Sequence, residues 1–276
     1  MDRIRLIASD MDATLLDEQS QLPADFEETI HALAELGIRF APASGRPLYT
    51  LEAMFPTLQD ELVFIGDNGG AIRWKGQNLF TSEMSPEGWR ALNRLTREQG
   101  DIAVLCGLES AYVERPFAVH DAVLRHFYTK IEYVDRLEDV TAPADKFTIY
   151  LPQHNAQQAY DTVYASQRSI YSVAVAGECW VDIMNPGVHK GAALEVLGRA
   201  WDLPPECMMA FGDTYNDAEM LQTVRYGFLM ENGSEPLRQK VPFLAPSHRE
   251  AGVMQVLHRV LAQNGCVCPE DFIPAH

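Results

Sequence analysis

The sequence predicts an α/β fold in which a mainly parallel sheet, covered by helices on both faces, is interrupted by an inserted α+β module. Two observations predict this fold. Strand-like apolar segments alternate with helical segments at both ends of the chain, whereas the middle holds closely spaced strand candidates. Hydrophobic residues make up 47% of the 276 residues, which is enough to bury a sizeable core.

The N-terminal part reads as a strand-helix-strand unit. Residues 3–10 (RIRLIASD) predict a strand, and residues 25–37 predict a helix that ends at a glycine. Residues 38–45 (IRFAPASG) predict the next strand. A helix that joins two strands in this way is typical of parallel pairing.

The C-terminal part continues the alternation. Residues 190–203 and 216–224 predict helices, and the apolar segments at 207–213 and 226–231 predict strands. Parallel strands with helices between them are normally buried on both faces. We therefore expect both ends of the chain to contribute to one sheet.

The middle of the chain predicts a separate α+β module. Five segments are strand candidates, and two longer segments, at residues 85–100 and 155–168, predict helices. The strand candidates are residues 101–107, 110–116, 146–152, 169–177 and 179–185. Tyr160 and Tyr164 lie one helical turn apart, and we expect them to pack in the core of this module.

Charge limits the partners of the protein. The formal net charge of −17, with no local cluster of lysine or arginine, disfavours nucleic-acid binding. No apolar run reaches the roughly 20 residues that a membrane helix needs, so we expect a cytoplasmic protein without a membrane partner. We also expect a monomer or weak homodimer. A small anionic substrate would require local cations at its site.

The five cysteines are odd in number and mostly scattered, so we expect free thiols rather than a disulfide framework. The pair in CVC, close to the end of the chain, lacks the further ligands of a metal site. We expect this segment to form a loose tail.

Asp10 and Asp12 directly follow the first predicted strand. Two unit charges about 4 Å apart repel each other by roughly 4 kcal/mol at an effective dielectric constant of 20. Such a pair therefore needs a cation, a shared proton or solvent beside it. On its own, the pair is also compatible with a solvated turn.

Three further segments place polar residues after a predicted strand or at a helix start. They are Ser44-Gly45-Arg46, Lys190, and Asp213 with Asn216 and Asp217. The first could receive an anion through its hydroxyl and free backbone N–H groups, and Lys190 would add positive charge at a helix N-terminus. Because ligands of open α/β sheets bind outside the carboxyl ends of the strands, we expect the three segments to converge there.

In their order, the segments DMDAT, ASGR, HKG and GDTYND resemble the motifs of the haloacid-dehalogenase-like (HAD) phosphohydrolases. DNGGAI at residues 67–72 and the ending GVMQVLHRVL further resemble the Cof-type subfamily. This resemblance implies a three-layer Rossmann-like core formed by residues 1–81 and 187–276. It also implies a C2-type α+β cap domain at residues 82–186, inserted in the long interval between Ser44 and Lys190.

The resemblance also implies phosphatase chemistry on small phosphorylated metabolites, with sugar phosphates as the common substrates. Asp10 would be the nucleophile that forms an aspartyl-phosphate, and Asp12 would be the general acid and base. Mg²⁺ would be held by the Asp10 side chain, the Asp12 main-chain carbonyl and Asp213, with Asp217 supporting this shell.

Ser44, Gly45, Lys190 and Asn216 would bind the phosphoryl oxygens, again by resemblance. Arg46 could contact the substrate or pair with an acid of the core, and the sequence leaves both alternatives open. His189 is expected to be an exposed loop histidine.

Ala13 departs from the family pattern, which has glycine after the second aspartate. If this position has a negative φ, alanine costs little, whereas a positive φ would strain the loop by about 1 kcal/mol or more.

Two other functions remain open at this point. A phosphotransferase or phosphomutase of the same superfamily would use the same acids and pass the phosphoryl group to a second hydroxyl. A non-catalytic phospho-acceptor module would use Asp10 alone, but such receiver domains have about 120 residues and no cap.

Overall fold

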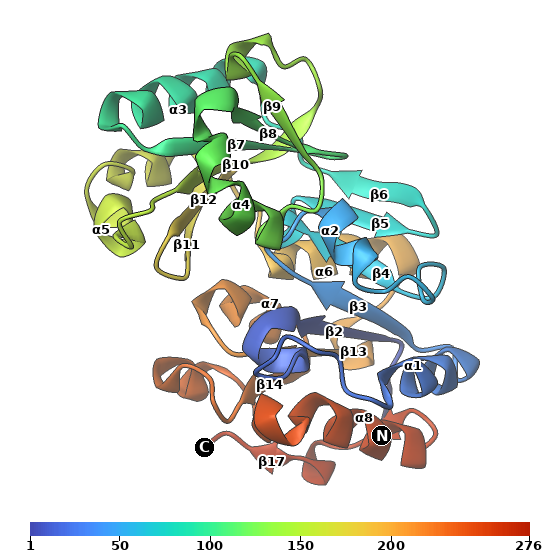
Figure 1. The fold of residues 1–276 in the computed structure, drawn as a ribbon. Coiled ribbons are helices and arrows are strands. Elements are labelled where there is room, and N and C mark those ends of the chain that lie inside the picture. The colour runs from blue at the N-terminus through green and yellow to red at the C-terminus, as the bar shows by residue number, and fades with distance from the viewer.

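The computed structural model describes residues 1–276, which form two large sheets, one above the other (Figure 1), and a small sheet of two strands. We call the upper part, from α3 to β12 (Pro86–Met184), the cap, and the remainder the core. The core sheet is mainly parallel with helices on both faces, and the cap combines helices with a mainly antiparallel sheet. The predicted fold class is therefore confirmed. The domain boundaries at residues 82 and 186 stay a prediction.

The core sheet has the strand order β17-β15-β14-β13-β2-β3-β4-β5-β6. Its strands are β2 Leu6–Asp10, β3 Arg39–Ala43, β4 Val63–Gly66, β5 Ala71–Trp74, β6 Gln77–Thr81, β13 Met208–Gly212, β14 Tyr226–Met230, β15 Phe243–Ala245 and β17 Ile273–Pro274. The strands from β15 to β4 pair in parallel, and β5, β6 and β17 add antiparallel edges. β2 lies between β13 and β3, so its carboxyl end is flanked by theirs.

Helices cover both faces of this sheet. The core helices are α1 Phe26–Glu35, α2 Leu48–Ala53, α6 Lys190–Trp201, α7 Ala218–Thr223 and α8 Gly252–Ala262. Because side chains alternate along a strand, the two faces of the sheet carry different residues. Phe40 and Phe211 pack towards α1, α2 and α8. Ala41 and Ala210 pack towards α6 and α7 on the opposite face. The small residues on the second face leave room for α6, whose first residue is Lys190.

The cap sheet has the strand order β11-β12-β10-β7-β8-β9. The cap elements are α3 Pro86–Gln99, β7 Ile102–Gly107, β8 Ala111–Glu114, α4 Asp121–Phe127, β9 Ile131–Val134, β10 Ala144–Tyr150, α5 Ala156–Asp161, β11 Ser172–Ala176 and β12 Trp180–Met184. One face packs against α3 and α5 through residues such as Phe147 and Val181. Figure 1 shows the cap sheet above the carboxyl-end edge of the core.

All five strands predicted in the middle of the chain are present, and the sequence reading missed β9 and α4. The helix predicted over residues 155–168 is shorter, because α5 ends at Asp161. The Thr162 hydroxyl donates to the Gln158 carbonyl, and the chain then turns so that Tyr164 is fully buried. Tyr164 packs in the cap core with Tyr160 against it, as expected.

The C-terminal segment is not a loose tail, so this expectation was wrong. β16 (Cys266–Val267) pairs with β1 (Asp2–Arg3), and β17 pairs with β15. Val267 and Phe272 are buried in the core, which explains the order of the segment. All five cysteines are free, and none of the helices is long and apolar enough to cross a membrane.

Candidate functional site

The candidate site forms at the carboxyl ends of three neighbouring strands. Asp10 ends β2, Ser44 follows β3, and Asp213 follows β13. Parallel pairing of these strands brings together residues that lie far apart in the sequence. The predicted convergence of the motifs at this edge is therefore observed.

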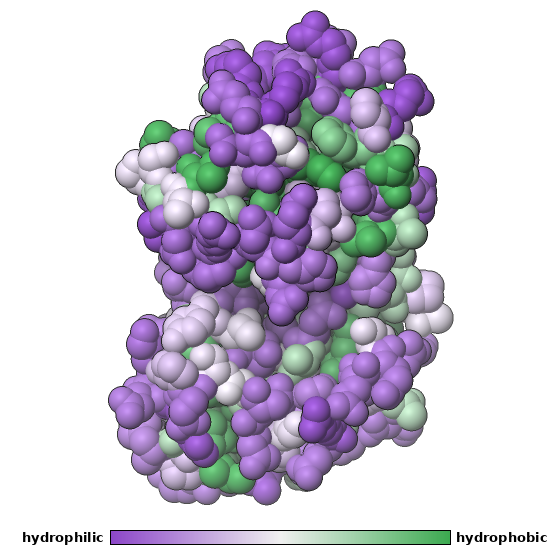
Figure 2. All heavy atoms as spheres, turned by 60° about the vertical axis from the view of Figure 1, so that its left-hand side comes forward, coloured by the Kyte–Doolittle hydropathy of each residue, from purple (hydrophilic) through white to green (hydrophobic).

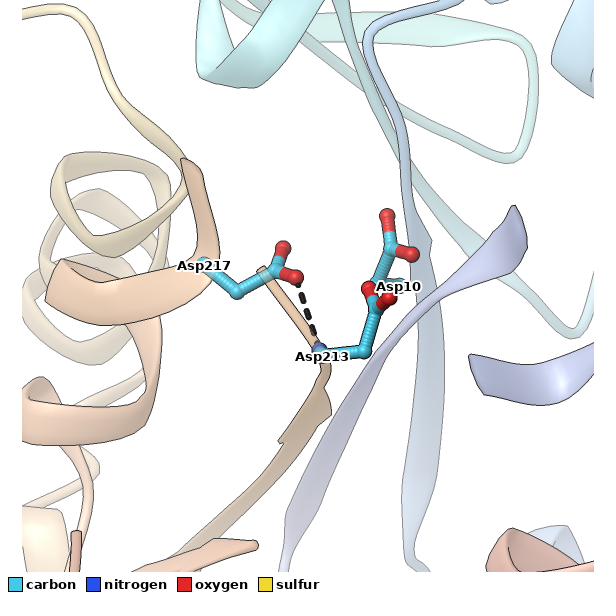
Figure 3. A group of neighbouring side chains, drawn as sticks. All are labelled: Asp10, Asp213 and Asp217. Atoms are coloured by element: carbon cyan, nitrogen blue, oxygen red, sulfur yellow. Dashed lines mark hydrogen bonds between the residues drawn. The ribbon is translucent and has the colours of Figure 1, made fainter. Parts of the chain in front are cut away.

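Asp10, Asp213 and Asp217 form a buried acidic cluster (Figure 3). One carboxylate oxygen from each lies within 4.8 Å of the other two. Asp217 is held in place because its Oδ2 accepts hydrogen bonds from the backbone N–H groups of Asp213 (3.1 Å) and Thr214 (3.3 Å).

Lys190 is the cation of this cluster. Its fully buried ammonium pairs with the Asp10 carboxylate and lies 2.6 Å from Asp217 Oδ1. His189 fixes the start of α6, since its Nδ1 accepts a hydrogen bond from Ala192 N at 3.1 Å. His189 is thus a half-buried N-cap, and the expectation of an exposed loop histidine was wrong.

The charges in the cluster do not balance. Burial, together with Asp217 and Asp213, raises the pKa of Asp10 against the opposing effect of Lys190. Burial and then Asp217 raise the pKa of Asp213 to about 7. Three carboxyl groups share one ammonium, so this set of hard oxygen donors fits a divalent cation such as Mg²⁺.

The Asp12 side chain lies outside this cluster and pairs with Arg46. Arg46 Nη2 donates to both Asp12 carboxylate oxygens, at 2.8 and 3.1 Å. The Asp12 side chain is 56% exposed, whereas that of Arg46 is largely buried. Of the two alternatives for Arg46, the structure therefore has the pairing with an acid. Asp12 was expected to bind the metal only through its main-chain carbonyl, so the position of its side chain does not bear on that prediction. Asp217, expected only in support, adds a carboxylate to the cluster.

Ala13 occupies the left-handed region, with φ of +58° and ψ of 14°. A residue with a Cβ is strained there by roughly 1–2 kcal/mol. The turn is held by Asn232, whose side-chain amide donates to the Ala13 carbonyl at 2.8 Å and accepts from His248 N at 3.0 Å. No sequence motif indicated this role of Asn232.

The segment Ser44-Gly45-Arg46 after β3 was expected to offer free backbone N–H groups to an anion, and two of these groups are not free. Ser44 N donates to Ile65 O (2.9 Å), and Arg46 N donates to Ser44 Oγ (3.1 Å). These two N–H groups are therefore not free to bind an anion, because a carbonyl of β4 and the Ser44 hydroxyl already accept their hydrogen bonds. The Ser44 hydroxyl, Gly45 and the Asn216 side chain still line the same cavity as Asp10.

This cavity, with a volume of about 650 Å³, lies between the core and the cap. Figure 2 shows the surface hollowed between the two halves, with hydrophilic residues around the opening. The core contributes the acids and Ser44, and the cap contributes residues of α4, β10 and β12. A substrate of metabolite size can therefore contact both parts.

Several residues of the cap and of its junction with the core belong to the site but were not predicted from the sequence. Lys146 Nζ donates to Gly45 O at 2.5 Å and lies 3.1 Å from Asp67 Oδ1. Asn68 Nδ2 donates to Asp182 Oδ2 at 2.9 Å, which is a second link between core and cap. Polar residues in the middle of strands buried on both faces, as in ADKFTIY and WVDIM, were the available signal.

Comparisons with known proteins agree with this geometry. Residues 7–257 match the family model described as haloacid dehalogenase-like hydrolase. A solved structure, SMU.1108c from Streptococcus mutans UA159, superposes with a TM-score of 0.85 and 27% identity, covering 94% of this chain and 99% of that one.

Two curated relatives are phosphatases. The 5-amino-6-(5-phospho-D-ribitylamino)uracil phosphatase YbjI of Escherichia coli K12 is 30% identical over 262 residues, covering 94% of this chain and 96% of the relative. The HMP-PP phosphatase of Cronobacter sakazakii is 30% identical over 249 residues, covering 87% of this chain and 89% of the relative.

Proposed function

Because the chain belongs to the haloacid dehalogenase-like hydrolases and is a phosphoric monoester hydrolase, we propose that it is an Mg²⁺-dependent phosphatase of small phosphorylated metabolites that works through an aspartyl-phosphate. One observation carries this proposal. Asp10 lies against Lys190 and the other acids of the cluster, and Asp12 lies with Arg46 on the same cavity. This position of the two aspartates supports Asp10 as the nucleophile and Asp12 as the general acid and base for one substrate.

In the first step, an Asp10 carboxylate oxygen attacks phosphorus, and the bond from phosphorus to the leaving alcohol oxygen breaks. Asp12 gives its proton to that oxygen, so that a neutral alcohol leaves. In the second step, Asp12 takes a proton from water as the water oxygen attacks phosphorus. The bond between phosphorus and the Asp10 oxygen breaks, inorganic phosphate leaves, and Asp10 is again a carboxylate while Asp12 again carries a proton.

Asp10, Asp213 and the Asp12 main-chain carbonyl would hold Mg²⁺, and Asp217 lies close enough to support or join them. The ion would neutralise charge on the phosphoryl oxygens and on the acids. Ser44, Lys190 and Asn216 would provide further donors to these oxygens. Lys190 can do so only in part, because Asp10 and Asp217 already occupy its ammonium.

The expected substrates are small phosphate esters, with sugar phosphates as the first class to test. The E. coli relative is named for a phosphate carried by a ribityl chain on an aminouracil. We expect no nucleic-acid partner, because a net charge of −17 disfavours binding to the phosphate backbone. The monomeric or weakly dimeric state and the cytoplasmic location also stay predictions.

Phosphate release tests the function. We expect the purified protein to hydrolyse p-nitrophenyl phosphate with Mg²⁺, and Asp10→Asn to abolish this activity, because an amide cannot replace the nucleophile. Asp60→Asn, a matched change at an exposed aspartate, should retain activity. Full activity of Asp10→Asn, or in excess chelator, would contradict the mechanism. Net phosphate release from a sugar phosphate would exclude a strict phosphomutase.

A further inference from the structure

A buried lysine of the cap contacts the turn Ser44-Gly45-Arg46 of the core. Lys146 lies in β10, its side chain is 2% exposed, and its ammonium donates a hydrogen bond to the Gly45 carbonyl at 2.5 Å. The turn belongs to the proposed phosphate site. This contact therefore joins the cap to the reaction side of the cavity.

All three carbonyl groups of the turn accept hydrogen bonds. The first and the last are held by backbone groups of the core. Asn68 N donates to Ser44 O at 2.9 Å. Asp67 N donates to Arg46 O at 3.0 Å. The bond to the middle carbonyl comes from the cap, so the core holds both ends of the turn and the cap holds its central peptide.

The direction of this central peptide matters to two side chains of the proposed mechanism. Its N–H, which belongs to Arg46, donates to Ser44 Oγ at 3.1 Å, and the Arg46 side chain holds Asp12. Because residue 45 is glycine, the backbone on one side of the peptide is little restricted, and a rotation of the peptide costs little sterically. Such a rotation would turn the N–H away from the Ser44 hydroxyl. The bond from Lys146 opposes it.

Protein oxygens occupy the donors of Lys146. Besides Gly45 O, two carboxylate oxygens lie near its Nζ, Asp67 Oδ1 at 3.1 Å and Asp182 Oδ2 at 3.6 Å. An ammonium has three N–H groups, which matches these three oxygens. Asp182 is itself fixed, since the Thr148 hydroxyl donates to its Oδ1 at 2.6 Å. An effect of Lys146 on the substrate would therefore be indirect.

We propose that Lys146 is a positioning residue of the reaction, which holds the Gly45 carbonyl and so keeps the turn in the orientation that places the Ser44 hydroxyl and the Arg46 side chain. The cap thereby completes the reaction side of the site as well as covering it. This inference rests on the proposed function and deepens it. A displacement of a catalytic group by about 1 Å can lower a rate about 100-fold.

Lys146→Met tests the proposal, because methionine is also a long, unbranched side chain but carries no ammonium. We expect kcat for p-nitrophenyl phosphate with Mg²⁺ to fall about 10- to 100-fold. KM should change less than about threefold, because the lysine acts through the turn and not on the substrate. Lys130→Met is the matched control and should keep the wild-type kcat. Lys130 is an exposed cap lysine whose ammonium lies 5.7 Å from the ring centroid of Tyr49 in the core.

A double variant separates positioning from charge balance, because Lys146→Met alone leaves the buried Asp67 carboxylate without its cation. Lys146→Met/Asp67→Asn removes that charge and keeps the backbone N–H of residue 67, which holds Arg46 O. Residue 67 has a φ of +51°, which asparagine adopts more readily than most residues. We expect the double variant to regain most of the wild-type melting temperature, while its kcat stays about as low as that of Lys146→Met.

Three results would overturn the proposal and leave the proposed function intact. They are a wild-type kcat in Lys146→Met, a loss of activity that lies in KM alone, and recovery of kcat together with the melting temperature in the double variant. A double variant that does not fold would also overturn it, because the lysine would then be required by the fold and not by the turn. Absence of phosphate release by the wild-type protein would instead overturn the proposed function, and this proposal with it.

Discussion

At the scale of single residues, the site contains a strained turn at Ala13 and a cluster whose acids outnumber its cation. Ala13 adopts a left-handed conformation in the turn that follows Asp10 and Asp12, the proposed catalytic aspartates. Asp10, Asp213 and Asp217 place three carboxyl groups around Lys190. Each feature leads to a measurable consequence.

Ala13→Gly should raise the free energy of unfolding by up to about 1 kcal/mol. Glycine removes a left-handed strain of roughly 1–2 kcal/mol, and its more flexible unfolded chain offsets part of this gain. Urea denaturation measures the change. The control is Ala34→Gly in the exposed part of α1, which should lower stability by about 1 kcal/mol because its backbone is helical. Equal destabilisation by both changes would show that Ala13 is not strained.

Mg²⁺ should raise the melting temperature of the protein, because the proposed site in the acidic cluster exists only in the folded state. At a concentration of 100 times Kd, the stabilisation is about 2.7 kcal/mol. Asp213→Asn should reduce the Mg²⁺-dependent shift, since it removes one charged oxygen ligand. Thermal unfolding with and without Mg²⁺ checks this, and an unchanged shift in the variant would argue against Asp213 as a ligand.

The sequence was sufficient to predict that Asp10, Ser44, Lys190 and Asp213 meet, because strand ends of one parallel sheet share an edge. It was not sufficient to predict the φ of Ala13 or the partner of Arg46. Both depend on a loop conformation that Asn232, more than two hundred positions away in the chain, helps to hold.

At the scale of elements, β10 carries unusual chemistry for a strand buried along its whole length. Its polar residues Asp145, Lys146 and Thr148 face the core-cap junction or the cavity, while Phe147 and Ile149 pack on the cap helices. The sequence predicted β10 and β12 as strands. It did not show which buried face met the core, since both faces are covered and alternation alone cannot distinguish them.

Asp145→Asn should make the protein more stable at pH 8 and flatten the pH dependence of its stability. Burial and the nearby Asp67 charge raise the pKa of Asp145 well above its usual value, and burial raises the pKa of Asp67 from 3.8 to about 6 despite Lys146. Acids with raised pKa values stabilise the fold fully below their unfolded pKa. This stability is lost as pH rises through the folded pKa.

Urea denaturation between pH 5 and pH 8 measures this effect, with Asp139→Asn, at an exposed aspartate of the cap, as the control. The control should follow the wild-type curve. An Asp145→Asn protein that loses stability with rising pH as steeply as the wild type would contradict the assignment.

At the scale of the whole molecule, the net charge is −17, and each cation of the site is paired with acids, so an anionic substrate would depend on the proposed metal ion for further positive charge. Lys190 and Arg46 come from the core, and Lys146 comes from the cap and contacts Gly45 of the core. The cavity is complete only when the two parts lie together, as they do here. Motifs in the sequence therefore predicted the reaction side of the site, whereas the leaving-group side depended on how the cap packs.

The central claim, that Asp10 carries the phosphoryl group, can be tested by trapping. The protein is mixed with p-nitrophenyl phosphate and Mg²⁺, quenched during turnover and reduced with borohydride, which converts an aspartyl-phosphate to homoserine. Peptide mass spectrometry should find homoserine at position 10 in the wild type, and no such product in Asp10→Asn. A phosphoryl group on another residue, or continued turnover by Asp10→Asn, would contradict the account.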